Sequence, residues 1–162
     1  MRNSLSISAL LFVLTVIAAA SCKGRFYVAV QDEHVASKVA GRFMAAAFIK
    51  SDYDAAYQQL DSKVQTLWTK EKFQSIVETM HPKGRPDSLT IDEYLSFPKA
   101  IELISKGESG DEEFRYLIRL AGNSDAGYSV VALYRSIEPF TSKRKAKKVK
   151  PPFKVDVSLL AG

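Results

Sequence analysis

The stretch Phe48-Ile49-Lys50-Ser51-Asp52-Tyr53-Asp54-Ala55-Ala56-Tyr57 separates two helical patterns and sets the order of the elements around it. Before it, apolar residues recur every three or four positions, which predicts a helix over residues 31–50. Ser51 and Asp52 interrupt that pattern. Both residue types accept hydrogen bonds from the free N–H groups of a first helical turn, so they are suited to cap a second, short helix over residues 53–60.

Beyond these helices the apolar period changes from that of a helix to that of a strand. Thr69 is the predicted N-cap of one further helix, and His81-Pro82 ends it because proline disfavours the helical conformation of the residue before it. Strands are then predicted over residues 88–94, 100–105, 114–120, 128–134 and 153–159. The pair Asp92-Glu93 is alternatively part of a short helical turn.

Helices followed by a run of strands predict an α+β fold in which a curved antiparallel sheet packs one apolar face on the helices. This order, a helix carrying Phe73 and the stretch at residues 48–57 together resemble the nuclear transport factor 2-like superfamily, which has a cystatin-like cone fold. The likeness spans residues 31–160. It implies a cone whose mouth can hold a ligand, with a cavity lined by Phe43, Tyr57, Trp68 and Tyr134, but no activity, because this fold hosts enzymes, binding modules and dimerisation domains.

The first 22 residues have the features of an export signal. Arg2 precedes an uncharged run over residues 5–20, which is shorter than the roughly 20 residues that a membrane-spanning helix needs. The run ends in Ala19-Ala20-Ser21-Cys22, and Cys22 is the only cysteine of the chain. This ending resembles the lipobox of bacterial lipoproteins, in which small residues precede a cysteine.

In bacterial lipoproteins a peptidase cuts just before the cysteine, and acyl chains on that residue anchor the protein in the membrane. The resemblance implies a signal peptide over residues 1–21, a lipidated tether over 22–30 and a single domain over 31–162. Lys23, in place of an Asp after Cys22, implies the outer membrane if the host has one. The alternatives are an ordinary cleaved signal, which leaves Cys22 as a free thiol, and an uncleaved anchor.

The formal charge of +5 is unevenly distributed. Six basic residues fall in one short run, and the other 16 basic residues after Arg2 are balanced by 18 acidic ones. A charge block of this kind is typical of interaction segments, and anionic lipid headgroups or an anionic envelope polymer would suit it. The run comprises Lys143, Arg144, Lys145, Lys147, Lys148 and Lys150.

Two further expectations concern this basic run. The first is the alternative that the run is only a solvated hairpin loop. The second depends on the last four strands forming a meander, in which case the acidic turn at residues 108–113 lies at the same end of the sheet and partly neutralises the basic run. Nucleic acid is not an expected partner, since no aromatic residue interleaves the lysines.

No metal site, cofactor or catalytic motif is predicted. His34 and His81 are the only histidines, and neither has a second ligand at a recognised spacing. We therefore expect a non-catalytic binding or interaction module of the envelope, with an unidentified protein as a further candidate partner. The alternatives are a carrier of an apolar small molecule and, following the superfamily, an isomerase-like enzyme that would draw on Tyr57, Asp61, Tyr116 and Tyr134.

Overall fold

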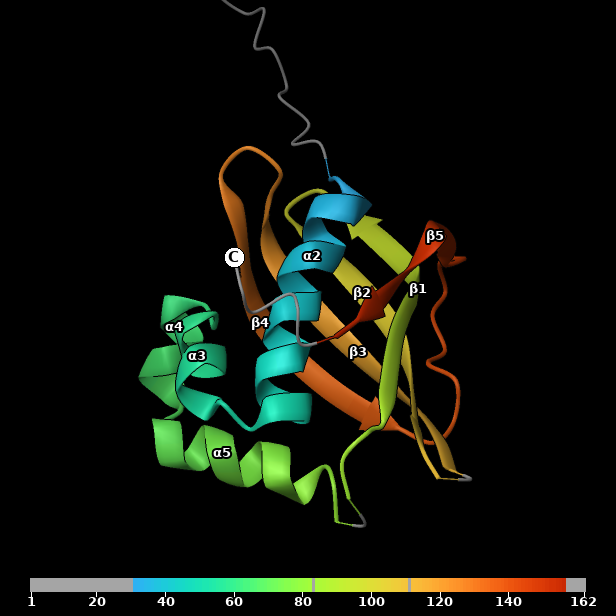
Figure 1. Ribbon diagram of the computed structural model, residues 1–162. Coiled ribbons are helices and arrows are strands. Elements are labelled where there is room, and N and C mark those ends of the chain that lie inside the picture. The colour runs from blue at the N-terminus through green and yellow to red at the C-terminus, as the bar shows by residue number, and fades with distance from the viewer. Residues whose placement is uncertain (1–30, 83, 111, 157–162) are drawn as a thin grey trace, which may run out of the picture.

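The computed structural model describes residues 31–82, 84–110 and 112–156, and it confirms an α+β fold with helices before strands. The helical elements are α2 (Glu33–Met44), the π-helix η1 (Ala45–Lys50), α3 (Tyr53–Gln58), α4 (Ser62–Leu67) and α5 (Lys70–Thr79). The strands are β1 (Ser88–Phe97), β2 (Ala100–Ser109), β3 (Glu112–Asn123), β4 (Gly127–Ser136) and β5 (Lys147–Val155) (Figure 1).

The predicted helix caps are confirmed at α3 and α5. The Asp52 carboxylate accepts a hydrogen bond from Ala55 N at 3.0 Å, and the Thr69 hydroxyl accepts one from Lys72 N. The long first helix is present as α2 continued by the π-helix η1, and Ser51, with a φ of 59°, ends it. Helix α4, which the sequence did not predict, is six residues long and buries none of them.

The five strands form one antiparallel sheet in the order β4-β3-β2-β1-β5. The predicted meander of the last four strands is therefore wrong, because β5 pairs with β1 at the opposite edge from β4. The connection at residues 137–146 runs along the sheet from the end of β4 to the start of β5 (Figure 1). The pair Asp92-Glu93 belongs to a strand, since β1 continues through it with a register shift.

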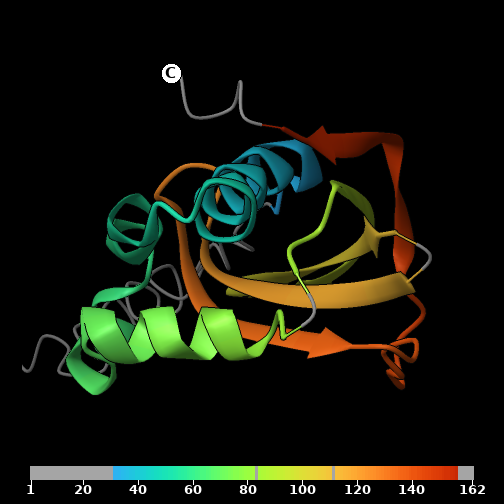
Figure 2. The ribbon, with the colours of Figure 1, turned by 60° about the horizontal axis from the view of Figure 1, so that its bottom comes forward.

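The sheet curls around α2, which lies against its concave face (Figure 2). Strand β3 shows the expected alternation, with Phe114, Tyr116, Ile118 and Leu120 buried in the core. Aromatic rings from the helices fill the interior beside them, and Phe43, Phe48 and Phe73 are each 1% exposed or less. The inside of the curled sheet is thus packed with side chains.

A bulge in β4 changes which of its residues face the core. Leu120 pairs with Val130 while Arg119 pairs with Ala132, so one additional residue, Val131, is inserted in β4. Strict alternation along the predicted strand at residues 128–134 would put Tyr128, Val130, Ala132 and Tyr134 on a single face. Because the side-chain period of a strand is two, one inserted residue reverses the faces beyond it.

Each edge of the sheet is interrupted at a position where a further strand could not pair regularly. At the β4 edge, Val130 exchanges hydrogen bonds with the helix connection, donating to Gln59 O at 3.0 Å and accepting from Asp61 N at 2.9 Å. At the β5 edge, Pro151 and Pro152 are exposed and have no N–H to donate.

The sheet has two ends, which we call upper and lower as they stand in Figure 1. The β1–β2 turn, the β3–β4 turn and the start of β5 lie at the upper end, and the β2–β3 turn and the end of β4 lie at the lower end (Figure 1). The described chain begins at the upper end, since the Gln31 side chain donates to Gly122 O at 3.0 Å and Asp32 N donates to the Tyr128 hydroxyl at 3.1 Å.

Candidate functional site

The structure does not bring the four proposed cavity residues to one space. Phe43 is completely buried in the core. The Tyr57 hydroxyl donates to Trp68 O at 2.7 Å, so these two residues tie α3 to the segment that follows α4. Tyr134 is 56% exposed, because the bulge in β4 turns it to the outer face of the sheet opposite Leu117.

The basic run does not lie in a hairpin loop, because β4 and β5 do not pair, and this corrects that alternative. Residues 143–146 end the long connection, and residues 147–150 begin β5. The Arg144 guanidinium carbon lies 4.8 Å from the centroid of the Phe97 ring, and Arg144 donates to Ser96 O at 3.3 Å. Lys147 lies 5.9 Å from the Tyr94 ring centroid. Aromatic rings at the end of β1 therefore hold these cations at the upper end of the sheet.

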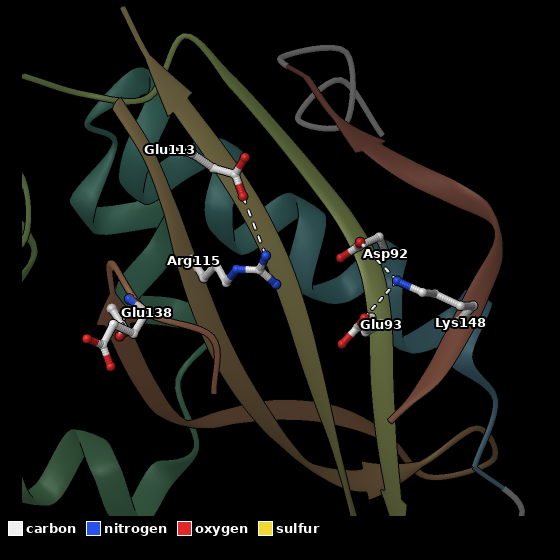
Figure 3. A network of polar contacts seen from close by, with 7 residues as sticks. Asp92, Glu93, Glu113, Arg115, Glu138 and Lys148 are labelled. Carbon is white, nitrogen blue, oxygen red and sulfur yellow. Dashed lines mark hydrogen bonds and ion pairs between the residues drawn. The ribbon is translucent and has the colours of Figure 1, made fainter. Parts of the chain in front are cut away.

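One lysine of the run is neutralised by acidic groups of β1. Lys148 Nζ lies 2.7 Å from Glu93 and 3.6 Å from Asp92 (Figure 3), and the hydrogen bond with Glu93 raises the pKa of Lys148. The acidic turn at residues 108–113 lies at the lower end of the sheet, so its predicted proximity to the basic run is wrong.

Sequence reasoning missed two cations that join the run in space. Arg119 on β3 places its guanidinium 5.4 Å from the same Phe97 ring, and Lys99 is exposed in the β1–β2 turn. Both border a hollow of about 500 Å³ beside Phe97 on the outer face. The alternation of side chains along β3 puts Arg119 on the outer face. Its proximity to Arg144, however, depends on how β3, β2, β1 and β5 pair, which the sequence did not predict.

We call this group of side chains the basic upper surface, and it comprises Lys99, Arg119, Lys143, Arg144, Lys145 and Lys147. Its charge is partly offset. Arg119 lies 3.5 Å from Glu102, and Asp125 is in the β3–β4 turn at the same end. The Asp32 carboxylate, also at this end, accepts the backbone N–H groups of His34 and Val35 at the start of α2. The upper end thus has a basic side at β1 and β5 and an acidic side near the β3–β4 turn.

A second polar cluster lies inside the fold near the lower end. The buried Tyr116 hydroxyl is 2.5 Å from His81 Nε2, and His81 Nδ1 is 2.9 Å from Val77 O. A carbonyl oxygen only accepts hydrogen bonds, so the Nδ1–H group of His81 donates to Val77 O. The unprotonated Nε2 then accepts a hydrogen bond from the Tyr116 hydroxyl. The Phe48 ring stacks on Tyr116 with a centroid distance of 4.7 Å. The ring of His81, which the sequence suggested only as a helix-ending residue, thus links α5 to β3.

Burial governs the ionisation of this pair. It lowers the pKa of the His81 ring, which the charges of Arg135 and Arg85 lower further, and it raises the pKa of Tyr116. Both groups are therefore neutral at pH 7. The other residues weighed for an isomerase do not join them, since Asp61 caps α4 and accepts from the Ser129 hydroxyl at 2.9 Å.

The lipobox residues Ala19, Ala20, Ser21 and Cys22 lie outside the described residues. Within the part of the chain that the structure describes, no three His, Cys, Asp or Glu side chains could together hold a metal ion. None of the described helices has the length and apolar character to cross a membrane. Comparison of the chain with protein-family models, curated proteins and solved structures finds no match.

Proposed function

We propose that this protein is a bacterial envelope lipoprotein anchored through acyl chains on Cys22, and that its domain is a non-catalytic binding module of the cystatin-like cone type. In this proposal the basic upper surface binds the anionic headgroups of the membrane that holds the anchor. The observation that carries the proposal is that the chain leading from Cys22 enters the domain at the same end as that surface.

The reach of the tether supports this arrangement. Gln31 is fixed to Gly122 at the upper end, and it lies nine positions after Cys22. A fully extended tether of that length spans about 30 Å. The acyl chains would therefore keep the upper end close to the headgroups, where each basic residue contributes about 1 kcal/mol near an anionic leaflet.

The contacts of these cations with aromatic rings also favour binding to anionic headgroups. Phe97 contacts both Arg119 and Arg144, and Tyr94 contacts Lys147, so these side chains are already held in place before they meet a charged surface. Less side-chain entropy is lost on binding when the contacting groups are ordered beforehand.

The anchor is tested by intact mass of the protein from the membrane fraction of its native host, with a Cys22→Ser chain beside it. We expect a mass that begins at Cys22 and carries acyl chains, and we expect the variant to lack that modification. An unmodified wild-type chain in the soluble fraction would refute the anchor.

The surface is tested by hydrogen exchange of the lipidated chain in vesicles of phosphatidylcholine alone or mixed with phosphatidylglycerol. We expect protection of residues 97–99 and 143–147 on the anionic vesicles, and its loss at high salt or in an Arg144→Gln/Lys147→Gln variant. A Lys63→Gln/Lys72→Gln variant removes two exposed charges from α4 and α5 and should keep the protection. Equal protection on neutral vesicles would show that the basic upper surface does not bind headgroups.

A further inference from the structure

Arg135 lies on β4 at the lower end of the sheet, away from the basic upper surface. The bulge in β4 that turns Tyr134 outward turns Arg135 toward the core side. Its guanidinium carbon lies 4.4 Å from the centroid of the Phe114 ring. That ring in turn packs so closely on Gly107 that an added Cβ would lie 2.7 Å from it. The guanidinium is thus held on a fixed aromatic platform.

One donor of this guanidinium has no acceptor among the described residues. Arg135 Nε is buried and makes no hydrogen bond within this part of the chain. Nearly all buried N–H groups in proteins have an acceptor, and a cationic donor forms its strongest hydrogen bonds with an anion. Tyr116 also hydrogen-bonds the Arg135 side chain, but Tyr116 and its partner His81 are neutral, so this pair supplies no anion.

The same guanidinium borders a hollow of about 200 Å³ at the lower end. Three apolar side chains contribute to its wall, and Ile137 among them is 78% exposed at the rim. Ser109 and Glu112 are polar residues of the same wall. A water molecule takes about 30 Å³, so the hollow admits a ligand of about six non-hydrogen atoms. The apolar residues of the wall are Pro82, Phe114 and Ile137.

We propose that this hollow binds a small monocarboxylate with a short apolar tail. The carboxylate would accept hydrogen bonds from the terminal guanidinium N–H groups of Arg135, because Nε is closed to a ligand in the hollow, and paired hydrogen bonds to a carboxylate are a geometry that arginine favours. The tail would pack between Phe114 and Ile137. Glu112 lines the same hollow, and its negative charge would weaken the binding of an anion. This site is separate from the basic upper surface, so either proposal can fail while the other holds.

The test uses butyrate as the probe and the full chain as it is isolated from its native host, in detergent at pH 7, with calorimetry and NMR shift mapping. We expect a dissociation constant of about 1 mM for so small a ligand, and no binding of butyramide, which has the same shape without the charge. Arg135→Gln should weaken binding at least about tenfold. Glu112→Gln should strengthen it about twofold.

A matched control separates the site from the general charge of the protein. Arg115 lies at the same end of the sheet on the outer face of β3, beside Glu113, so Arg115→Gln should leave the affinity unchanged. A second variant, Ile137→Glu, adds a negative charge at an exposed rim position that the core does not need, and it should abolish binding while the chain stays folded.

Three results would overturn the proposal. Butyramide binding as well as butyrate would show that the charge is not recognised. Unchanged affinity in both Arg135→Gln and Ile137→Glu would show that the ligand binds elsewhere. Inorganic phosphate binding more tightly than butyrate would replace the carboxylate with a different class of anion.

Discussion

Replacing His81 by Gln should make the stability of the protein less sensitive to acid. His81 is held neutral in the folded chain, with Nδ1–H donating to Val77 O and Nε2 accepting from Tyr116. Burial lowers its folded pKa, so the unfolded chain binds a proton at a higher pH than the folded chain does. The stabilisation is therefore complete above the unfolded pKa of about 6.5 and is lost progressively as the pH falls below it.

The structure sets a limit on the size of this effect. One proton taken up only on unfolding changes the free energy of unfolding by at most about 1.4 kcal/mol per pH unit. Between pH 6.5 and pH 5.0 the upper limit is thus about 2 kcal/mol. Because the ring is only about half-buried, solvent screening reduces the expected difference between wild type and His81→Gln to about 1 kcal/mol.

The assay is urea unfolding of the detergent-solubilised chain from pH 8.0 to pH 5.0, followed by the fluorescence of Trp68, the only tryptophan. As the pH falls over this range, the free energy of unfolding should decrease more for wild type than for His81→Gln. His34 is the only other histidine and is exposed, so His34→Gln serves as the control and should follow wild type. Parallel profiles for wild type and His81→Gln would refute the reasoning, since they would mean that folding does not change the proton affinity of His81.

Three substitutions test the packing and the caps by the same unfolding assay. Gly107→Ala should destabilise the protein by about 2 kcal/mol, because its Cβ would lie 2.7 Å from the Phe114 ring, and an unchanged stability would contradict that contact. Val149→Ala should cost about 1 kcal/mol since the side chain is buried in the core, whereas Lys150→Ala beside it is exposed and should cost little. Asp52→Ala should cost about 1 kcal/mol through loss of the α3 cap, and a neutral effect would show that the cap is dispensable.

Local patterns in the sequence predicted the elements, and non-local pairing decided what they could not. The caps Asp52 and Thr69 act within one turn of their own position, so the residues around them suffice to identify them. The pairing of β5 with β1 depends on which distant edge is available, and no residue in β5 specifies it locally. Helix α4 was missed because it has no buried face to create an apolar period.

The candidate site divides in the same way. Composition identified the basic run, but the contact of Arg144 with Phe97 arises only because the connection at residues 137–146 crosses to the far edge. Alternation placed Tyr134 with the inward residues of β4, and a single inserted residue reversed that placement. The same insertion turned Arg135 toward the hollow, so one bulge accounts both for a failed prediction and for the position of the proposed carboxylate site.

The interrupted sheet edges would have a consequence if the protein is held on a membrane as proposed above. Anchored chains share one plane, where their local concentration is high and neighbouring sheets meet edge to edge. At β4 the exchange of hydrogen bonds between Val130 and the helix connection occupies the backbone, and at β5 Pro151 and Pro152 offer no donors. In that arrangement, the interruptions at Val130 and at the two prolines should disfavour edge-to-edge pairing between crowded domains.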